Sequence, residues 1–240
     1  MEASKRYIKD LVTEDFRKAS VFEKYAIDFC CGGKKPLEAA CLEKGIDLTQ
    51  VLADLHDLDS VSSRAGTRFD EWDLDFLAEY IIRNHHQYLR RAIPSLSAHT
   101  EKIAAVHGAN HPELIQIAER FSAIAAELTS HMAKEERILF PYIANLAAAK
   151  RDGLIPQRPP FQSIANPIRM MEAEHQSAGD GTAFIRSASS GYAVPADGCT
   201  TYRVTYKELE EFERDLHQHV HLENNILFPK AIDLEALLLA

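Results

Sequence analysis

The sequence has few of the features that mark secreted or membrane-spanning proteins. Four cysteines in 240 residues, at positions 30, 31, 41 and 199, are too few for a disulfide framework, which favours a reducing, cytoplasmic setting. The longest apolar stretch, around residues 138–149, is interrupted by Pro141 and Asn145 and is too short to cross a bilayer. The first residues are polar and charged, so we expect no signal peptide and no membrane association.

Positive charge is also scarce. The formal net charge is −9 and no run of Lys and Arg stands out, which excludes a nucleic-acid partner because phosphates require a basic face. A hydrophobic content of 46% with 26% charged residues is ordinary for a globular protein that buries a substantial core.

Two stretches of the chain repeat the pattern H-x-x-x-E-x-x-I-L-F-P. The first begins at His131 and contains Glu135, and the second begins at His219 and contains Glu223. Positions i and i+4 of a helix share a face, so each copy presents an imidazole and a carboxylate together. The I-L-F-P tail is explained by core packing and by a helix kink at its proline.

A further histidine precedes each copy at nearly the same distance. His86 lies 45 residues before His131, and His175 lies 44 residues before His219. Two nitrogen donors and one carboxylate in each half form a natural ligand set for a pair of metal ions. The candidate ligands are His86, His131, Glu135, His175, His219 and Glu223.

Helical spacing places these residues on apolar stripes. In the second long segment, for example, the stripe runs through Ile117, Phe121, Ile124, Leu128, His131, Glu135 and Ile138. A single His/Glu pair is usually a surface pair, but burying four imidazoles and two carboxylates without partners would cost several kcal/mol. Metal coordination would offset that cost, and a hydrogen-bonded polar core is the alternative.

The donor set limits the choice of metal. Imidazoles and carboxylates without thiolates suit iron, manganese or zinc. Two carboxylates in a bundle core commonly bridge two ions, whereas a structural zinc site is closed and usually holds one. We therefore expect two iron ions with an oxo or hydroxo bridge, and with open positions for O2 or NO.

A polar stretch of small residues without apolar periodicity divides the chain into two parts. We expect a small helical domain over residues 1–62, a linker over 63–72 and an antiparallel four-helix bundle over 73–240, an all-α fold. The small domain should hold helices from Thr13 to about Ile27, from Pro36 to Gly45 and from Asp47 to about Asp57. The long helices should cover about 73–107, 112–150, 163–189 and 200–232.

The other histidines near the motifs carry weaker expectations. His85 falls off the apolar stripe, as do His217 and His221. A surface position is expected for these and for His99, His107 and His111, and a hydrogen bond to a metal ligand is the alternative. Tyr88 either lines the site or packs beside it.

The adjacent Cys30 and Cys31 are the other unusual feature. Their Cα atoms are about 3.8 Å apart across a trans peptide, below the usual range for a disulfide of about 4.4–6.8 Å. They either form a strained redox pair or act as separate thiols, with Gly32-Gly33 and Lys34-Lys35 lowering a thiol pKa. Two small buried residues at a helix end are the structural alternative. Cys41 and Cys199 carry no motif.

The chain resembles the bacterial iron–sulfur cluster repair di-iron family, in which a hemerythrin-like domain follows a small Cys-Cys domain. The resemblance rests on residues 27–33, on Met171-Glu-Ala-Glu-His175, on Ser130–Glu135 and on Leu222–Pro229. It implies a non-haem di-iron centre with the six ligands named above. We expect Cys30 and Cys31 to take part in the chemistry as reactive thiols. The resemblance also implies a cytoplasmic role in nitrosative or oxidative stress, with damaged or apo iron–sulfur proteins as partners.

Several functions fit these residues. The first is an iron-supplying repair factor, which we favour over a turnover enzyme. The alternatives are a nitric-oxide-binding protein, an oxidoreductase acting on NO or peroxide, and a structural zinc bundle. Oxygen-carrying hemerythrins resemble the chain less, because they use five histidines. Whether the protein forms a homodimer stays open.

Overall fold

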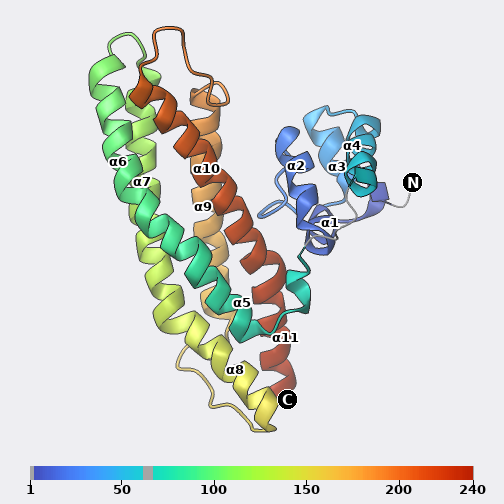
Figure 1. Cartoon of the computed structure of the whole chain (residues 1–240). Helices are drawn as coiled ribbons and strands as arrows, with labels where there is room; N and C mark the ends of the chain where they lie inside the picture. Colours follow the sequence, from blue (N-terminus) through green and yellow to red (C-terminus); the bar gives the residue numbers. More distant parts are fainter. Residues whose placement is uncertain (1–2, 62–66, 240) are drawn as a thin grey trace.

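The computed structural model describes residues 3–61 and 67–239. Within these residues the chain is helical and contains no strand, with one isolated bridge between Tyr7 and Pro36. A small helical N-terminal part lies beside one long helical bundle (Figure 1). The expected all-α fold with a four-helix bundle is confirmed.

The N-terminal part contains α1 (Ile8–Glu14), α2 (Ala19–Lys24), α3 (Leu37–Lys44) and α4 (Leu48–Val61). The helix expected from Thr13 to Ile27 is wrong, because Thr13 lies inside α1 and the backbone becomes extended at Asp15. The Asp15 carboxylate accepts a hydrogen bond from the Arg17 N–H at 3.0 Å and so caps the next short turn, Phe16–Lys18.

The other two helices of this part begin as expected. Pro36 precedes α3, and Gly45 ends it at a φ of 66°, a left-handed conformation that glycine adopts without strain. The Asp47 carboxylate accepts a hydrogen bond from the Thr49 N–H at 2.9 Å at the start of α4. That helix continues to Val61, four residues beyond the expected end at Asp57.

The expected linker over 63–72 is described only in part, since residues 62–66 lie outside the described ranges. Its last residues include the short turn Phe69–Glu71, in which the Phe69 side chain is buried. The Phe69 ring packs against Trp72 and Tyr80, with centroids 4.8 and 5.5 Å away. The chain therefore enters the bundle through an aromatic cluster.

Four helical rods form the bundle (Figure 1). Rod 1 is α5 (Leu74–Ile81), the π-turn η4 (Ile82–His86) and α6 (Gln87–His107); rod 2 is α7 (Glu113–Lys134), the π-turn η5 (Glu135–Leu139) and α8 (Phe140–Asp152); rod 3 is α9 (Ala165–Ala188); and rod 4 is α10 (Thr200–Leu222), the π-turn η6 (Glu223–Leu227) and α11 (Phe228–Leu239). These bounds match the expected ones within a few residues, except that rod 4 continues past residue 232.

The two I-L-F-P tails coincide with π-turns. Pro141 and Pro229 each follow such a turn closely, in α8 and α11. Proline lacks an N–H and its ring crowds the carbonyl four residues earlier, which a wider turn relieves. The extra residue shifts the helical register, so Ile138 is 51% exposed and Leu139 takes the buried position. The expectation that Ile138 continues the buried stripe is wrong for this reason.

The bundle interior is apolar on both sides of the level of the candidate ligands. The first apolar cluster joins the N-terminal part to one end of the bundle and includes Leu89, Phe121, Leu128, Ala178 and Leu216. The second fills the other end and includes Ile81, Leu139, Met171, Leu222 and Phe228. The polar ligand layer therefore lies between two dry clusters.

Close packing between rods 2 and 3 generates a stability prediction. A Cβ added at Gly181 would lie 2.7 Å from Cδ1 and 2.8 Å from Cγ1 of the buried Ile124, whereas one at Gly179 would meet nothing within 4 Å. We expect Gly181→Ala to be less stable than the matched control Gly179→Ala by about 1–2 kcal/mol, because overpacking offsets the helix propensity gained. Urea unfolding followed by circular dichroism measures this difference, and equal stability of the two variants would contradict the packing described.

Candidate metal centre

The six candidate ligands meet at one level of the bundle. Three of them lie at π-turns: His86 ends η4, Glu135 begins η5 and Glu223 begins η6. Such turns are frequent at functional sites, where they redirect a side chain. All six side chains are at most 1% exposed: His86, His131, Glu135, His175, His219 and Glu223.

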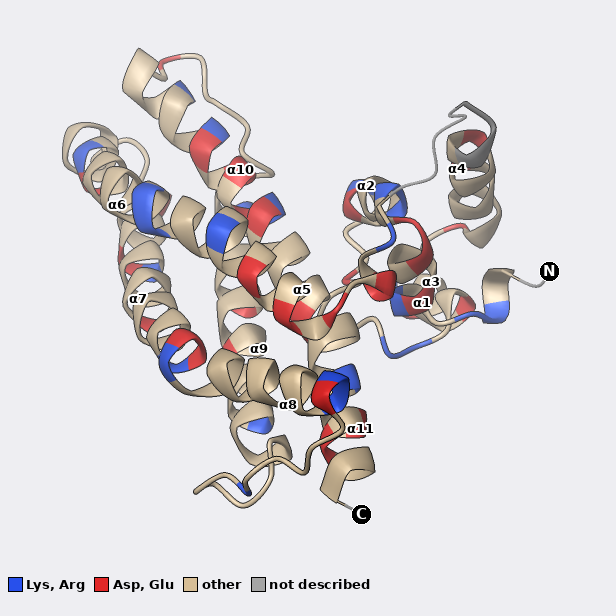
Figure 2. Cartoon of the chain, turned by 60° about the horizontal axis from the view of Figure 1, so that its bottom comes forward, with Lys and Arg blue, Asp and Glu red and all other residues tan. Residues whose placement is uncertain are grey.

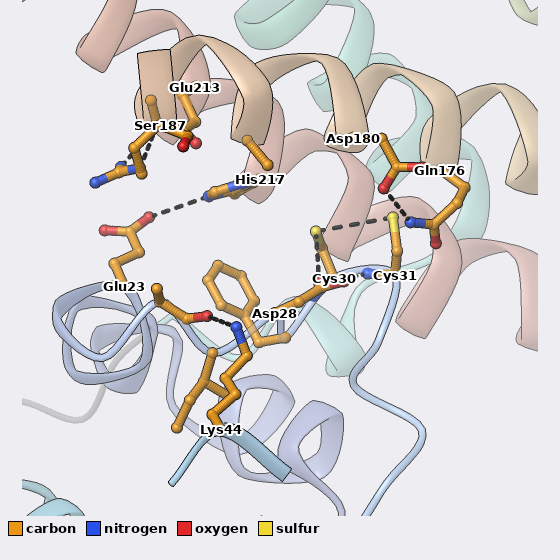
Figure 3. A pocket seen from close by; sticks show the side chains of 16 residues that line it. Glu23, Asp28, Cys30, Cys31, Lys44, Gln176, Asp180, Ser187, Glu213 and His217 are labelled. Atoms are coloured by element: carbon orange, nitrogen blue, oxygen red, sulfur yellow. Dashed lines mark hydrogen bonds and ion pairs between the residues drawn. The ribbon is translucent and has the colours of Figure 1, made fainter. Parts of the chain in front are cut away.

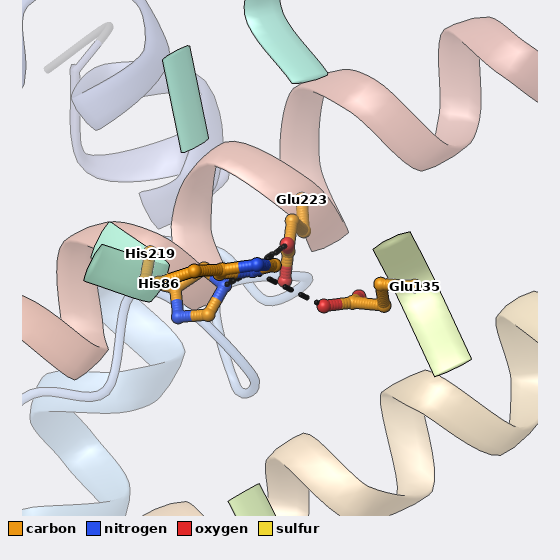
Figure 4. Close-up of side chains that lie close together, drawn as sticks. All are labelled: His86, Glu135, His219 and Glu223. Carbon is orange, nitrogen blue, oxygen red and sulfur yellow. Dashed lines mark hydrogen bonds and ion pairs between the residues drawn. The ribbon is translucent and has the colours of Figure 1, made fainter. Parts of the chain in front are cut away.

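His86 and His219 form one half of the site with the two carboxylates (Figure 4). Their Nε2 atoms lie 3.2 Å apart. The His219 Nε2 atom is 3.0 Å from Glu223 Oε1, and the His86 Nε2 atom is 3.4 Å from Glu135 Oε2 and 4.0 Å from Glu223 Oε1. We call this arrangement half A.

His131 and His175 form half B with the same two carboxylates. Their Nε2 atoms lie 3.0 Å apart. The His131 Nε2 atom is 3.2 Å from Glu135 Oε2, and the His175 Nε2 atom is 3.0 Å from Glu223 Oε2. In each half one ligand atom per residue lies within 4.8 Å of the others. Glu135 and Glu223 therefore serve both halves, as bridging carboxylates would.

The second ring nitrogen, Nδ1, is hydrogen-bonded in three of the four imidazoles. The pairs are His86 Nδ1 with Glu136 Oε1 at 2.7 Å, His131 Nδ1 with Glu174 Oε2 at 2.8 Å, and His175 Nδ1 with Asn224 Oδ1 at 2.8 Å. Because each partner is an acceptor, the proton resides on Nδ1 and Nε2 presents a lone pair. These partners thus orient the ligands toward the interior.

Two of these acceptors are themselves held by cations. Both oxygens of Glu136 accept hydrogen bonds from Arg90, at 2.7 and 2.6 Å, and Glu174 is paired with Lys134. The charge of each supporting carboxylate is therefore balanced outside the ligand layer.

The arrangement leaves buried electron pairs without donors. The lone pairs of His131 and His175 face one another, both oxygens of Glu135 accept no hydrogen bond, and neither does Oε2 of Glu223. Each such buried acceptor costs about 1–3 kcal/mol. A cation between these atoms removes the cost, so the residues fit a metal ion, and their nitrogen and oxygen donors suit a transition metal.

Without an ion, protons and carboxylates balance one another in the layer. Burial opposes a charge on His131, but the Glu135 carboxylate raises its pKa to about 9. Burial and the charge of Glu223 oppose ionisation of Glu135, yet His131 and His86 lower its pKa to about 2. Protons and a metal ion therefore compete for the same atoms.

The sequence reasoning missed the supporting acceptors, although each stands beside a ligand in the chain. Glu136 follows Glu135, Glu174 precedes His175, and Asn224 follows Glu223. Adjacent residues on a helix point in different directions, so each supports the histidine of the neighbouring rod. A polar residue flanking a ligand was the signal that could have found them.

Two of the histidines expected at the surface are buried. His85 is 3% exposed and His221 is 1% exposed. His221 lies between the rings of Phe16 and Phe29, with centroids 5.9 and 5.8 Å away, because the N-terminal part covers this side of α10. Its pKa falls to about 3 as a result of burial. Tyr88 packs against the first apolar cluster, and burial raises its pKa to about 12.

Cys30 and Cys31 lie in the loop between α2 and α3, against rods 3 and 4 (Figure 3). They border a cavity of about 400 Å³ whose other side includes Gln176, Asp180 and His217. Cys30 is buried and Cys31 is partly exposed, and both thiols are free. The alternative that Cys30 and Cys31 lie at the end of a helix is wrong, because the pair lies well beyond the end of α2.

The alternative in which residues 32–35 lower a thiol pKa is also wrong for Cys30. The N–H groups of Cys30, Cys31 and Gly32 all donate to the carboxylate of Asp28, at 2.9, 2.9 and 2.8 Å. Lys34 and Lys35 pair with carboxylates of their own. The contact with the Cys31 thiol, burial and the charge of Asp28 raise the pKa of Cys30 well above its usual range.

The Cys-Cys loop nevertheless contacts the ligand layer through one residue. Asn224 holds His175 Nδ1 with its Oδ1, and its Nδ2 lies 3.9 Å from the Sγ of Cys31. The neighbouring Asn225 donates to the backbone carbonyls of Phe29 and Cys30, both at 3.2 Å. The loop is thus fixed to η6, where Glu223 is placed.

These surroundings predict the order in which the thiols react. Cys199 is exposed, and the Tyr202 N–H and His107 lower its pKa to about 7. We expect iodoacetamide to modify Cys199 first, at a rate that rises as the pH passes about 7, because the thiolate is the nucleophile. The buried Cys30 and Cys41 should react last.

Mass spectrometry of peptides from the folded protein measures this order, with urea-unfolded protein as the control in which all four cysteines react. Modification of Cys30 as fast as Cys199 at pH 7 would contradict the environment described.

The fold and the buried layer of histidines and glutamates define a hemerythrin-type cation-binding bundle. Residues 77–231 match the family model described as the hemerythrin HHE cation binding domain. Residues 4–59 match ScdA_N, described as a domain of unknown function (DUF542).

Whole-chain relatives specify the family further. A probable iron–sulfur cluster repair protein of Haemophilus influenzae is 34% identical, over 97% of this chain and 99% of its own. The iron–sulfur cluster repair protein YtfE of Edwardsiella ictaluri is 35% identical over 90% of this chain and 91% of its own, and that of Yersinia pestis is 34% identical over the same shares. The chain belongs to the family of iron–sulfur cluster repair proteins.

Proposed function

We propose that this chain is a non-haem di-iron protein that repairs iron–sulfur clusters damaged by nitrosative or oxidative stress, by supplying iron. The observation that carries the proposal is the pair of four-residue halves that share Glu135 and Glu223 inside a dry bundle. The names of the relatives, which cover nearly the whole chain, support repair as the purpose of that site.

The donor set supports iron as the cargo. Each half offers two imidazoles and two carboxylate oxygens, the mixed nitrogen and oxygen set that suits iron. Two bridging carboxylates would hold the second ion beside the first, with an oxo or hydroxo bridge between them. The six ligands in this proposal are His86, His131, Glu135, His175, His219 and Glu223.

The surrounding residues perform the binding and release. Glu136 and Glu174 orient His86 and His131, and the flanking apolar clusters exclude water from the layer. When the cargo leaves, protons take its place on the imidazoles, as the raised pKa of His131 indicates. We propose that the thiols of Cys31 and Cys30 assist the transfer from the cavity that they border.

The proposal also covers the location of the protein, its domains and its recipients. None of the helices within residues 3–61 and 67–239 has the length and apolarity that a bilayer crossing requires. Lys and Arg are interspersed with Asp and Glu on the helices drawn in Figure 2. We propose a cytoplasmic protein, divided at residues 63–72 into a Cys-Cys domain and a bundle, whose recipients are damaged or apo iron–sulfur proteins.

Metal content tests the ligand set. We expect about two iron ions per chain in the purified protein, and loss of at least one in His131→Ala, because that imidazole belongs to the buried half B. His99→Ala is the matched control, since His99 contacts Glu208 on a partly exposed face away from the site. Plasma emission spectrometry measures the iron. Unchanged iron content in His131→Ala would contradict the assignment of His131 as a ligand.

A transfer assay tests the repair function. We expect the iron-loaded protein to restore an enzyme whose [4Fe–4S] cluster has been nitrosylated, faster than an equal amount of free ferrous iron. The recovered activity of the recipient enzyme is measured, with His131→Ala as the control. Recovery of the enzyme activity no faster than with free ferrous iron would contradict the proposal.

Binding of nitric oxide is a second candidate function. Each half supplies four protein ligands, fewer than the six of an octahedral ion, and so leaves open positions for a small ligand. Stoichiometric NO should then give an iron-nitrosyl spectrum with the reduced protein, and absence of that species would eliminate this candidate. Sustained NO or peroxide consumption with an electron donor would instead identify an oxidoreductase.

A further inference from the structure

The acceptors that support the histidines follow a regular order around the bundle. Each supported histidine lies on one rod, and its acceptor stands beside a ligand on the next rod. The series runs from His86 on rod 1 to Glu136 on rod 2, from His131 on rod 2 to Glu174 on rod 3, and from His175 on rod 3 to Asn224 on rod 4.

The series is broken at His219 on rod 4. By the same order its acceptor would stand beside His86 on rod 1, where the two neighbours are His85, which is buried, and Gln87, which is exposed. The His85 ring does not accept a bond from His219 but lies parallel to it, with centroids 5.6 Å apart and an angle of 8° between the planes. Among the described residues, the buried Nδ1 of His219 has no hydrogen-bond partner.

A carboxylate that could support His219 is held by His85. Asp215 lies one turn before His219 on α10, and its Oδ1 is 2.9 Å from His85 Nδ1. The other oxygen of Asp215 is buried and has no hydrogen-bond partner within the described ranges. His85 therefore lies against His219 where an acceptor would be expected, and it also binds the carboxylate that stands one turn before His219.

We infer that the two halves bind iron unequally and that half A, with His86 and His219, gives up its ion before half B. The inference rests on the proposed function, because it assigns the order in which the cargo leaves. An unsupported imidazole is a weaker base and lacks the hydrogen bond that fixes its orientation, and loss of such a supporting partner lowers metal affinity by about 10–100-fold. Half B has both of its imidazoles supported and keeps its ion longer.

Release to a chelator tests the order. The iron-loaded full-length protein, reduced under anaerobic conditions, is mixed with an excess of a coloured ferrous chelator, and the iron released per chain is followed by absorbance. We expect two phases of about one ion each, with rates about 10–100-fold apart. Release of both ions at a single rate would overturn the inference and leave the proposed function standing. A protein that binds no iron would overturn both.

Three conservative variants assign the phases. Glu136→Gln weakens the support of His86 and should accelerate only the fast phase, whereas its matched partner Glu174→Gln weakens that of His131 and should accelerate only the slow phase. His85→Phe retains a ring against His219 and removes the hydrogen-bond partner of Asp215. The Asp215 carboxylate can then accept a hydrogen bond from Nδ1 of His219, so the fast phase should become slower. Acceleration of the fast phase by Glu174→Gln alone would place the early ion in half B and contradict the inference.

Discussion

The architecture depends on the electrostatics of one buried layer. Four imidazoles and two carboxylates lie inside the bundle at 0–1% exposure, where unpaired charges and lone pairs are costly. The apolar clusters on either side exclude water, which increases both the cost of these unpaired groups and their affinity for a cation. An ion in either half would join three of the four rods, and two ions together would join all four, so metal binding and the stability of the bundle are coupled.

The same layer links the bundle to the N-terminal part. Asn224 supports His175 with its oxygen and approaches Cys31 with its nitrogen, while Asn225 fixes the loop backbone. These residues belong to the π-turn that also places Glu223. Only Asn224 separates the ligand His175 from the Cys31 thiol. This contact gives a physical reason for the N-terminal part and the bundle to occur in one chain.

The sequence predicted the bundle and the convergence of the six side chains, because apolar periodicity and a doubled motif are strong local signals. It failed where the outcome depended on a local departure from the regular helix or on tertiary contacts. The register shift that exposes Ile138 comes from a π-turn, and His221 is buried because a second part of the chain covers it. The raised pKa of Cys30 follows from its contact with the Cys31 thiol, from burial and from the charge of Asp28, which also accepts a hydrogen bond from the N–H of Gly32.

Anomalous X-ray diffraction at the iron absorption edge, on crystals of the protein purified with its metal, locates any iron bound in the ligand layer. We expect two anomalous peaks in the layer, one beside the Nε2 atoms of His86 and His219 and one beside those of His131 and His175, with Glu135 and Glu223 between them. A single peak, no peak, or iron bound elsewhere in the chain would contradict this expectation.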